Sequence, residues 1–374
     1  MKKTSVSFRN LALLAAFMAL ASLTANAAQC PGCNCPPSQA CTKAELLVAF
    51  PDYVNTPDGM ALLKDGSIVV SVPNFNDETK PPLLMRVTGS AGKAKAEKFY
   101  EFPNPYPGLP QGLDRISPMG IVQAPSGDIY FADMQIRKDI SQKSRLWRLV
   151  MKGGKPQKMV LVAKNFNVAN GLCIRGGYLY ITDSVLEPGA NPLPSAVLRF
   201  KLTEENVELK TPLKNDPHII ATFTSKKMQW PFGADGIDFD NQGNLYVGLF
   251  GEGQMFKITF DKKGNVVSNT LFAEAPGKLI NCDGMHLDKR TNKLYMADSA
   301  ANAVQVIDCK TGKVETLDSN EDTLDKRTGG MDQPCEALVR GKEIIVSNMD
   351  WPFPGFKNTK WQQPATLSVI KLKK

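Results

Sequence analysis

The sequence has little of two things on which many proteins rely: histidine and long apolar segments. Its 374 residues include only two histidines, His218 and His286. With so few histidines, we expect neither a Ser-His-Asp triad nor a pair of catalytic histidines. We expect His286 to be packed inside a strand. No apolar run after residue 27 is long enough to cross a bilayer, so we predict no membrane span. Convincing helical periodicity is also missing there, which points away from a helical fold.

An excess of charge of one sign is missing as well. The formal net charge is +8, and it falls to +5 when the N-terminal segment is removed with Lys2, Lys3 and Arg9, because that segment contains no acid. The basic residues are scattered rather than clustered. We therefore expect no nucleic-acid partner.

The first 27 residues have the pattern of a secretory signal peptide. A basic start is followed by an apolar stretch over 11–23 and by the small-residue cleavage pattern Ala25-Asn26-Ala27. We predict a periplasmic or secreted protein that begins after Ala27. A lipoprotein anchor at Cys30 is the weaker alternative, because Gln29 stands where a small residue is expected.

Three parts of the chain are expected: a signal peptide at 1–27, a Cys-rich arm at 28–43 and one domain at 44–374. Eight cysteines in an exported chain favour disulfides. Four of them lie in the arm, and we predict two internal bridges among Cys30, Cys33, Cys35 and Cys41. A thiolate metal or redox site is the alternative for the arm. Covalent haem is excluded because no histidine follows Cys33.

The chain does contain one short sequence motif, or phrase, that is repeated six times. Each copy has a small or polar doublet, an apolar stretch, a tight turn and a second apolar stretch. The copies begin at Pro57, Pro118, Ala169, Ala234, Cys282 and Cys335. Each reads as a β-hairpin, and six hairpins at this spacing predict an all-β fold, a six-bladed β-propeller. A large β-sandwich or jelly roll is the alternative, against which six matching turns argue.

The two ends of the domain together supply one blade. The 37 residues after Ala337 and the 16 between Lys43 and Gly59 add up to a blade's length. We therefore expect a strand over 365–372 to pair with a strand over 46–50, which closes the ring and removes two open sheet edges.

In a propeller, equivalent positions of the repeat converge on the central channel. The residue before the glycine of each copy should begin the innermost strand. These residues are Asp58, Met119, Asn170, Asp235, Asp283 and Glu336. Four carboxylates and one amide near one axis repel each other unless a cation compensates, and no Lys or Arg holds an equivalent position. Hard oxygen ligands suit Ca²⁺, Mg²⁺ or Mn²⁺. The alternative for any one copy is that the Asp merely caps a turn.

Two further cysteines, Cys282 and Cys335, fall at the same place in adjacent copies. A bridge between them requires Cα atoms within about 7 Å. Cys173 lies on an apolar strand, so we expect a buried free thiol there.

Three phrases resemble the senescence marker protein and gluconolactonase family, with more distant similarity to paraoxonases and strictosidine synthases. Residues 234–247 resemble the family phrase PDG…D..G.LWVA, residues 170–184 the phrase NGL…YY.DS, and residues 335–338 the phrase GE.P. In the family the Glu lies in the first blade, whereas here it comes last. The order round the ring is retained. The resemblance implies a metal held by Glu336, Asn170 and Asp235.

The resemblance also implies a function: an exported, divalent-metal-dependent hydrolase of a lactone or ester. One cation is expected in the channel, Ca²⁺ first, with Mg²⁺, Mn²⁺ or Zn²⁺ as alternatives. Asp235 or Asp283 would assist proton transfer, and Asp58 and Met119 would face the small-molecule substrate. The family's additional substrate-binding Asn falls near Met119, and a paraoxonase-like His near Asp58, so the chain departs from both patterns.

Two other functions are open at this stage. One is a non-catalytic exported propeller with a structural cation, which binds a ligand or a protein partner through the Cys-rich arm or the aromatic segment 351–356. The favoured alternative for that segment is a loop packed over a blade. The other is a condensing enzyme of the strictosidine synthase type, in which a Glu acts as base without a metal. The expected metal trio argues against the second.

Overall fold

A computed structural model describes residues 43–137, 140–227, 229–322 and 329–372. The chain separates into a unit of residues 1–41 and a unit of residues 42–374, and the description concerns the second. The signal peptide and all four cysteines of the Cys-rich arm lie outside the described residues, so these predictions stay predictions.

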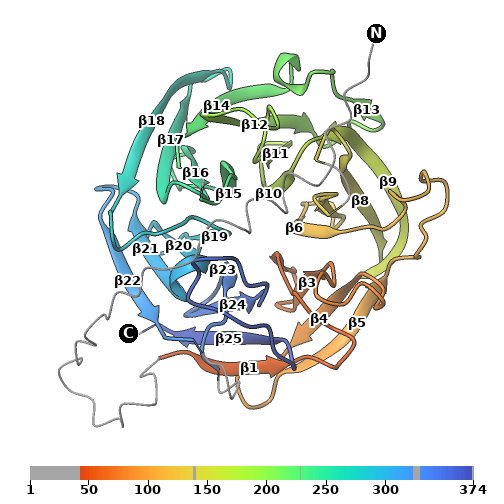
Figure 1. Cartoon of the computed structure of the whole chain (residues 1–374), viewed down its shortest axis with the longest axis vertical. Helices are drawn as coiled ribbons and strands as arrows, with labels where there is room; N and C mark the ends of the chain where they lie inside the picture. Colours follow the sequence, from red (N-terminus) through yellow and green to blue (C-terminus); the bar gives the residue numbers. More distant parts are fainter. Residues whose placement is uncertain (1–42, 138–139, 228, 323–328, 373–374) are drawn as a thin grey trace. The chain divides into compact units, whose positions relative to one another are not determined.

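The described residues form six antiparallel sheets arranged around a channel (Figure 1), which confirms the predicted six-bladed propeller. From the channel outward, the first three sheets are β2 (Met60–Leu62), β3 (Ile68–Val72), β4 (Leu83–Thr88) and β5 (Lys95–Glu101); β6 (Pro118–Gln123), β7 (Ile129–Asp133), β8 (Ser144–Lys152) and β9 (Lys155–Phe166); and β10 (Ala169–Arg175), β11 (Tyr178–Asp183), β12 (Leu193–Lys201) and β14 (Ile219–Ser225). The other three are β15 (Ala234–Phe239), β16 (Leu245–Leu249), β17 (Gln254–Phe260) and β18 (Val266–Glu274); β19 (Met285–Asp288), β20 (Lys293–Asp298), β21 (Ala303–Asp308) and β22 (Val314–Ser319); and β23 (Pro334–Arg340), β24 (Glu343–Asn348), β25 (Thr366–Lys371) and β1 (Glu45–Ala49).

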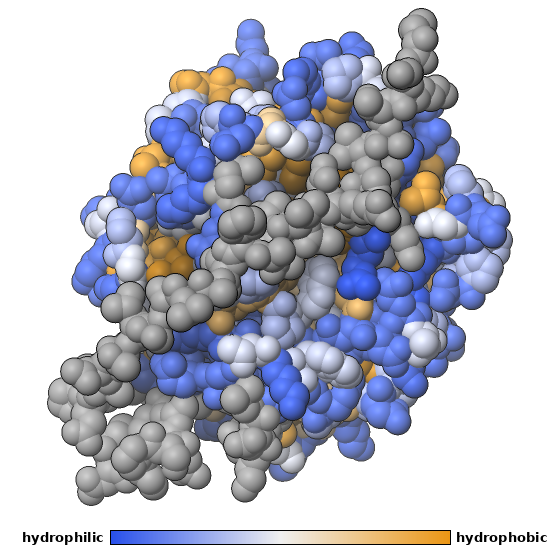
Figure 2. Space-filling view, in the orientation of Figure 1, coloured by the Kyte–Doolittle hydropathy of each residue, from blue (hydrophilic) through white to orange (hydrophobic). Residues whose placement is uncertain are grey.

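Helical structure within the described ranges is limited to two short 3₁₀ segments, η2 (Leu213–Asn215) and η3 (Ser299–Ala301). None of the helices in these ranges has the length and apolar character needed to cross a membrane. One sheet has a fifth strand, β13 (Val207–Glu208), which pairs parallel to the outer strand β9. The face shown in Figure 2 is mostly hydrophilic, with apolar residues in small separate patches.

The predicted turns form because their glycines accept a left-handed backbone. Gly66, Gly127 and Gly243 have φ values of 82°, 98° and 91°, a conformation that other residues adopt only with strain. Each lies between the first and second strands of a blade, where the sequence places a hairpin turn. Local turn chemistry therefore fixes the strand register of these blades.

The ring closes as the sequence predicts. β1 pairs antiparallel with β25, with Leu46 opposite Ser368 and Ala49 opposite Thr366. Leu47 and Val369 are buried between this sheet and its neighbour. One sheet thus contains both the first and the last strand of the domain.

No disulfide joins Cys282 and Cys335, because both thiols are free and buried. The two cysteines contact different neighbours. The Cys282 Sγ lies 3.5 Å from the carbonyl oxygen of Gln254 in the preceding blade, whereas the Cys335 Sγ lies 3.3 Å from that of Pro57 in the following blade. Cys173 is a buried free thiol, as predicted.

The innermost strands approach each other so closely that only glycine fits at their contacts. A Cβ on Gly120 would lie 2.3 Å from the carbonyl oxygen of Asn170 in the next blade. We expect Gly120→Ala to lower the free energy of unfolding by about 3 kcal/mol, since strands must separate to admit the methyl group. Urea denaturation measures this. The control Gly92→Ala, at a left-handed but open turn, should lose about 1 kcal/mol, and equal losses would contradict the close approach.

Candidate active site

Irregular pairing at the repeated doublet turns side chains toward the channel. The register of β10 shifts between Ala169 and Leu172, and that of β15 shifts between Ala234 and Ile237. A bulge of this kind re-aims the side chain at its centre. In these two blades the doublet therefore does more than end a loop, because it turns Asn170 and Asp235 toward the channel.

Five of the six predicted channel residues line one pocket. They are Asp58, Met119, Asn170, Asp235 and Asp283. The Asn170 Nδ2 donates a 2.8 Å hydrogen bond to the Asp235 Oδ2, and the Ser299 hydroxyl donates a 2.5 Å bond to the Asp283 Oδ2. The structure thus brings together carboxylates from blades that are distant in the sequence.

Glu336 does not occupy the pre-glycine position. The predicted alignment of the sixth copy with the other five copies is wrong by one residue. The Ser184 hydroxyl binds the carbonyl oxygen of Ala234, and the Ser299 hydroxyl binds that of Pro334 in the same way. Pro334 is therefore equivalent to Ala234. Cys335 consequently takes the position of Asp235, and Glu336 takes the position of a glycine.

Glu336 still belongs to the channel, one residue further along its strand. Its carboxylate lies against Gly284, where an added Cβ would be 2.6 Å from the Oε1. The same Oε1 lies 3.6 Å from the His286 Nε2. Among the residues that the structure describes, no hydrogen-bond partner satisfies this buried oxygen. His286 lies inside β19, as predicted, and burial lowers its pKa.

Burial and mutual repulsion raise the pKa values of the carboxyl groups of the channel. Burial raises the pKa of Asp58 to about 6, although the Cys335 thiol donates a hydrogen bond to it. Burial, followed by the charges of Asp283 and Asp58, raises the pKa of Asp235 well above its usual range. Asp283 and Glu336 are shifted in the same direction, again first by burial. Once ionised, these four groups would repel each other strongly.

These groups fit the chemistry of a divalent cation, although they are not gathered into a finished site. Among the described residues, no group of three His, Cys, Asp or Glu side chains is arranged as a metal site. The fit rests on the donors: buried carboxyl oxygens that repel each other, one of them the Oε1 of Glu336. Oxygen donors of this kind are those that Ca²⁺ and Mg²⁺ bind.

Sequence analysis missed the wall of the pocket, which is apolar and largely aromatic. It is built mainly by Phe232, Phe250, Met349, Trp351 and Phe353. Two of these residues lie in the aromatic segment 351–356, for which the sequence offers either a partner surface or a loop packed over a blade. The rest come from loops outside the repeated phrase, so no periodic signal identifies them.

The aspartates that end several copies of the phrase are structural. Asp183 accepts hydrogen bonds from the backbone N–H groups of Asn167 and Val168, and Asp298 does the same for Ile280 and Asn281. Each carboxylate fastens the loop that leads into an innermost strand. The repeated aspartates therefore hold the site's framework in place and do not face the pocket.

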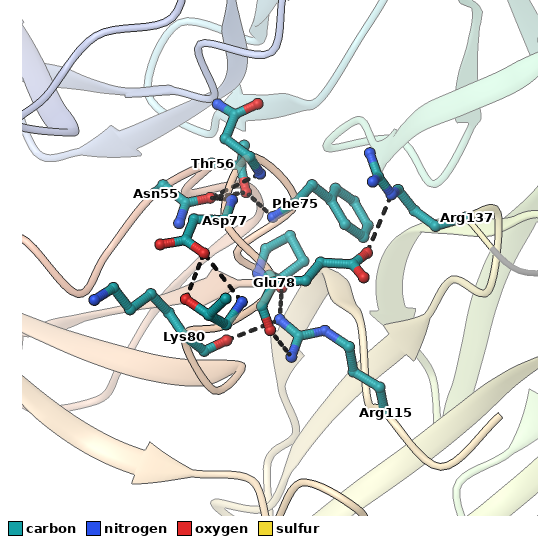
Figure 3. A network of polar contacts seen from close by, with 11 residues as sticks. Asn55, Thr56, Phe75, Asp77, Glu78, Lys80, Arg115 and Arg137 are labelled. Carbon is teal, nitrogen blue, oxygen red and sulfur yellow. Dashed lines mark hydrogen bonds and ion pairs between the residues drawn. The ribbon is translucent and has the colours of Figure 1, made fainter. Parts of the chain in front are cut away.

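A pinned loop supports one edge of the wall (Figure 3). The Arg115 guanidinium donates to the carbonyl oxygens of Pro73, Glu78 and Lys80, so the segment 73–80 is held in place. Phe75 of this segment packs against Trp351, with ring centroids 5.0 Å apart.

Comparisons with known proteins bear on the fold. No protein-family model matches the sequence, and no curated protein sequence matches it significantly. Solved structures do match. A gluconolactonase from Xanthomonas campestris is 13% identical over 90% of this chain and 99% of its own, with a TM-score of 0.52.

Two sugar dehydrogenases have the same fold. A PQQ-bound aldose sugar dehydrogenase from Streptomyces coelicolor is 14% identical over 90% of this chain and 99% of its own, with a TM-score of 0.52. A protein from Thermus thermophilus, described as a putative glucose dehydrogenase, is 12% identical over 88% and 99%, with a TM-score of 0.54. These likenesses confirm the propeller fold implied by the resemblance to gluconolactonases. At such identities a shared fold does not carry a shared reaction.

Proposed function

We propose that this protein is an exported hydrolase that cleaves a lactone or another ester with the help of one divalent cation in the propeller channel. One observation carries the proposal: Asp58, Asp235 and Asp283 are gathered at one pocket, and the described residues that line it include no Lys, Arg or His. Such a cluster is costly to a fold unless it binds something positive.

Asn170, Asp235 and Glu336 are the residues that would hold the cation. When bound, it would polarise the substrate carbonyl, offset the charge of the oxyanion and lower the pKa of a bound water. Ca²⁺ is our first choice because all three donors are oxygens. Mg²⁺, Mn²⁺ and Zn²⁺ are the alternatives to be tested against it.

Two aspartates would move the proton in this mechanism. Burial raises the pKa of Asp283, and a carboxyl group with a raised pKa suits general acid–base catalysis. The Ser299 hydroxyl fixes the orientation of the Asp283 carboxyl group. Asp235 is the second candidate for this role, and the apolar wall limits the access of bulk water to both.

A specific observation favours a second function, a ligand-binding propeller without catalysis. Asn170 of one blade is already bonded to Asp235 of the next. Side chains that satisfy each other across blades stabilise the ring, and a cation among them would then be structural. Partner binding through the Cys-rich arm remains a prediction, since the arm lies outside the described residues.

The decisive experiment combines metal analysis with a screen of lactones and aryl esters on the mature chain. We expect about one divalent ion per chain, loss of hydrolysis in EDTA and recovery with Ca²⁺ or another single metal. Full activity in EDTA would overturn the metal's role. If EDTA lowers the melting temperature while no lactone or ester is turned over, the ligand-binding function is correct instead.

A further inference from the structure

The pocket has two chemically different halves. Its floor carries the carboxyl and amide groups at the pre-glycine positions, and its wall is made of hydrocarbon and aromatic rings. The largest wall residues are Phe232, Phe250, Met349, Trp351 and Phe353. A substrate that places its reactive group at the floor must therefore place the rest of its surface against the wall.

Two polar groups of the wall are already used within the protein. The Ser184 hydroxyl donates to the carbonyl oxygen of Ala234 at 2.7 Å. The side-chain oxygen of Gln333 accepts the backbone N–H of Trp351 at 2.7 Å. A polyhydroxylated substrate would lose its bonds to water here without replacing them at these groups, and burial of unpaired hydroxyl groups is unfavourable.

The wall is fixed before any ligand arrives. Trp351 packs edge-on against Phe353, with ring centroids 5.0 Å apart, and Phe353 contacts the buried Phe356. Phe75, on the segment that Arg115 pins, contacts the same Trp351 ring. An apolar surface that is already ordered gains affinity because little freedom is lost on binding.

Charge at the rim does not change this chemistry. Arg137 lies beside the wall, and its guanidinium carbon is 6.0 Å from the Trp351 ring centroid. It is paired with Glu78 at 3.1 Å (Figure 3). The pair is close to neutral, and the carboxylate floor disfavours an anionic substrate.

We propose that the wall is a binding subsite for an uncharged alkyl or aryl group, so that the substrate is a hydrophobic lactone or ester and not a sugar lactone. The hydrolysis itself rests on the proposed function. The subsite does not, because it stands on the wall residues alone. A buried methylene group improves transition-state and ground-state binding alike.

A homologous series tests the subsite. The Ca²⁺-loaded mature chain is assayed by pH-stat with γ-butyrolactone, γ-hexalactone, γ-octalactone and γ-decalactone, and with gluconolactone. We expect kcat/KM to rise by roughly twofold to fourfold per methylene group until the pocket is filled, through KM more than kcat. Gluconolactone should be at least about tenfold poorer than γ-octalactone. Faster hydrolysis of gluconolactone would overturn the subsite and leave the proposed hydrolase standing.

Variants connect the effect to the wall. Trp351→Ala should reduce the gain per methylene group to less than about 1.5-fold, since the largest wall contact is removed. Trp361→Ala is the matched control, because Trp361 is 40% exposed and is not among the pocket residues. A chain-length dependence that Trp351→Ala leaves intact would contradict the assignment.

A binding measurement separates the two proposals. Calorimetry with 2-alkylcyclopentanones, which resemble lactones but cannot be hydrolysed, should show affinity that rises with alkyl length and falls in Trp351→Ala. If this holds while no lactone is hydrolysed, the subsite is correct and the hydrolase proposal fails. If the ketones do not bind and the lactone series shows no chain-length dependence, the subsite is overturned.

Discussion

Replacing Asp235 by asparagine is expected to lower kcat for the best ester or lactone by about 10³-fold or more. Asp235 lies at the centre of the proposed chemistry, bonded to Asn170 and coupled by charge to Asp283 and Asp58. An amide has neither the negative charge that binds a cation nor the proton that a carboxyl group exchanges. Losses of this size are typical when an electrostatic element of the transition-state site is removed.

The fold should survive this substitution. The Asp235→Asn variant keeps a side-chain oxygen that can accept the hydrogen bond from the Asn170 Nδ2, and it removes one charge from a group of buried carboxylates that repel each other. The metal-free variant should therefore melt at the same temperature as the unchanged protein or higher. Asp261→Asn, at an exposed turn, is the matched control and should keep full activity. Full activity in Asp235→Asn or Asp235→Ala would refute the catalytic assignment.

The metal-free protein is expected to lose stability as the pH rises from about 4 to 8. Burial raises the pKa values of Asp58, Asp183 and Asp298 from 3.8 to about 6. Between these values the folded chain keeps protons that the unfolded chain releases, so a higher pH favours unfolding. A shift of this size corresponds to on the order of 3 kcal/mol for each group.

Asp235, Asp283 and Glu336 add to this loss, because burial raises their pKa values in the same direction. Surface carboxylates such as Asp65 and Asp77 have lowered pKa values and titrate below this window. Added Ca²⁺ should compensate the ionised cluster. At a concentration of 100 Kd it stabilises by about 2.7 kcal/mol, or about 4 °C in a domain of this size.

Thermal melts in EDTA and in Ca²⁺ at pH 5 and pH 8 measure both effects. The Ca²⁺-dependent rise in melting temperature should be larger at pH 8 than at pH 5, since protonated carboxyls bind cations poorly. Asp235→Asn should abolish most of that rise. Equal stability of the metal-free protein at the two pH values would show that the cluster is not held as the structure indicates.

The fold could be predicted because each blade carries its own local signals. Turn glycines such as Gly66, Gly127 and Gly243 need a conformation that other residues avoid, and they recur at the same place in the repeat. Closure of the ring followed from the lengths of the two ends. The pre-glycine position predicted a shared pocket because equivalent strands must meet at the axis.

The register of the sixth copy could not be predicted by the same rule, because that copy has no glycine after its polar residue. Pro334, aligned with Pro118, is the signal that would have placed Cys335 at the channel position and Glu336 one step further. For the same reason Cys282 and Cys335, which the sequence aligns, do not occupy equivalent positions in their blades. The apolar wall lay beyond prediction because loops such as 351–356 carry no repeat, and tertiary packing alone brings Trp351 over the floor.

Closure of the ring has a consequence for how the chain folds. The strand pair β1 and β25 joins segments that are far apart in the sequence: Lys371 contacts Glu45 across 326 positions. Contacts of such separation form slowly, because a long loop must first be closed. Five blades can assemble during synthesis, whereas one edge of β24 stays unpaired until β25 has been made. A chain that stops before Thr366 would keep that edge exposed, and it should accumulate as aggregate rather than as a shorter propeller.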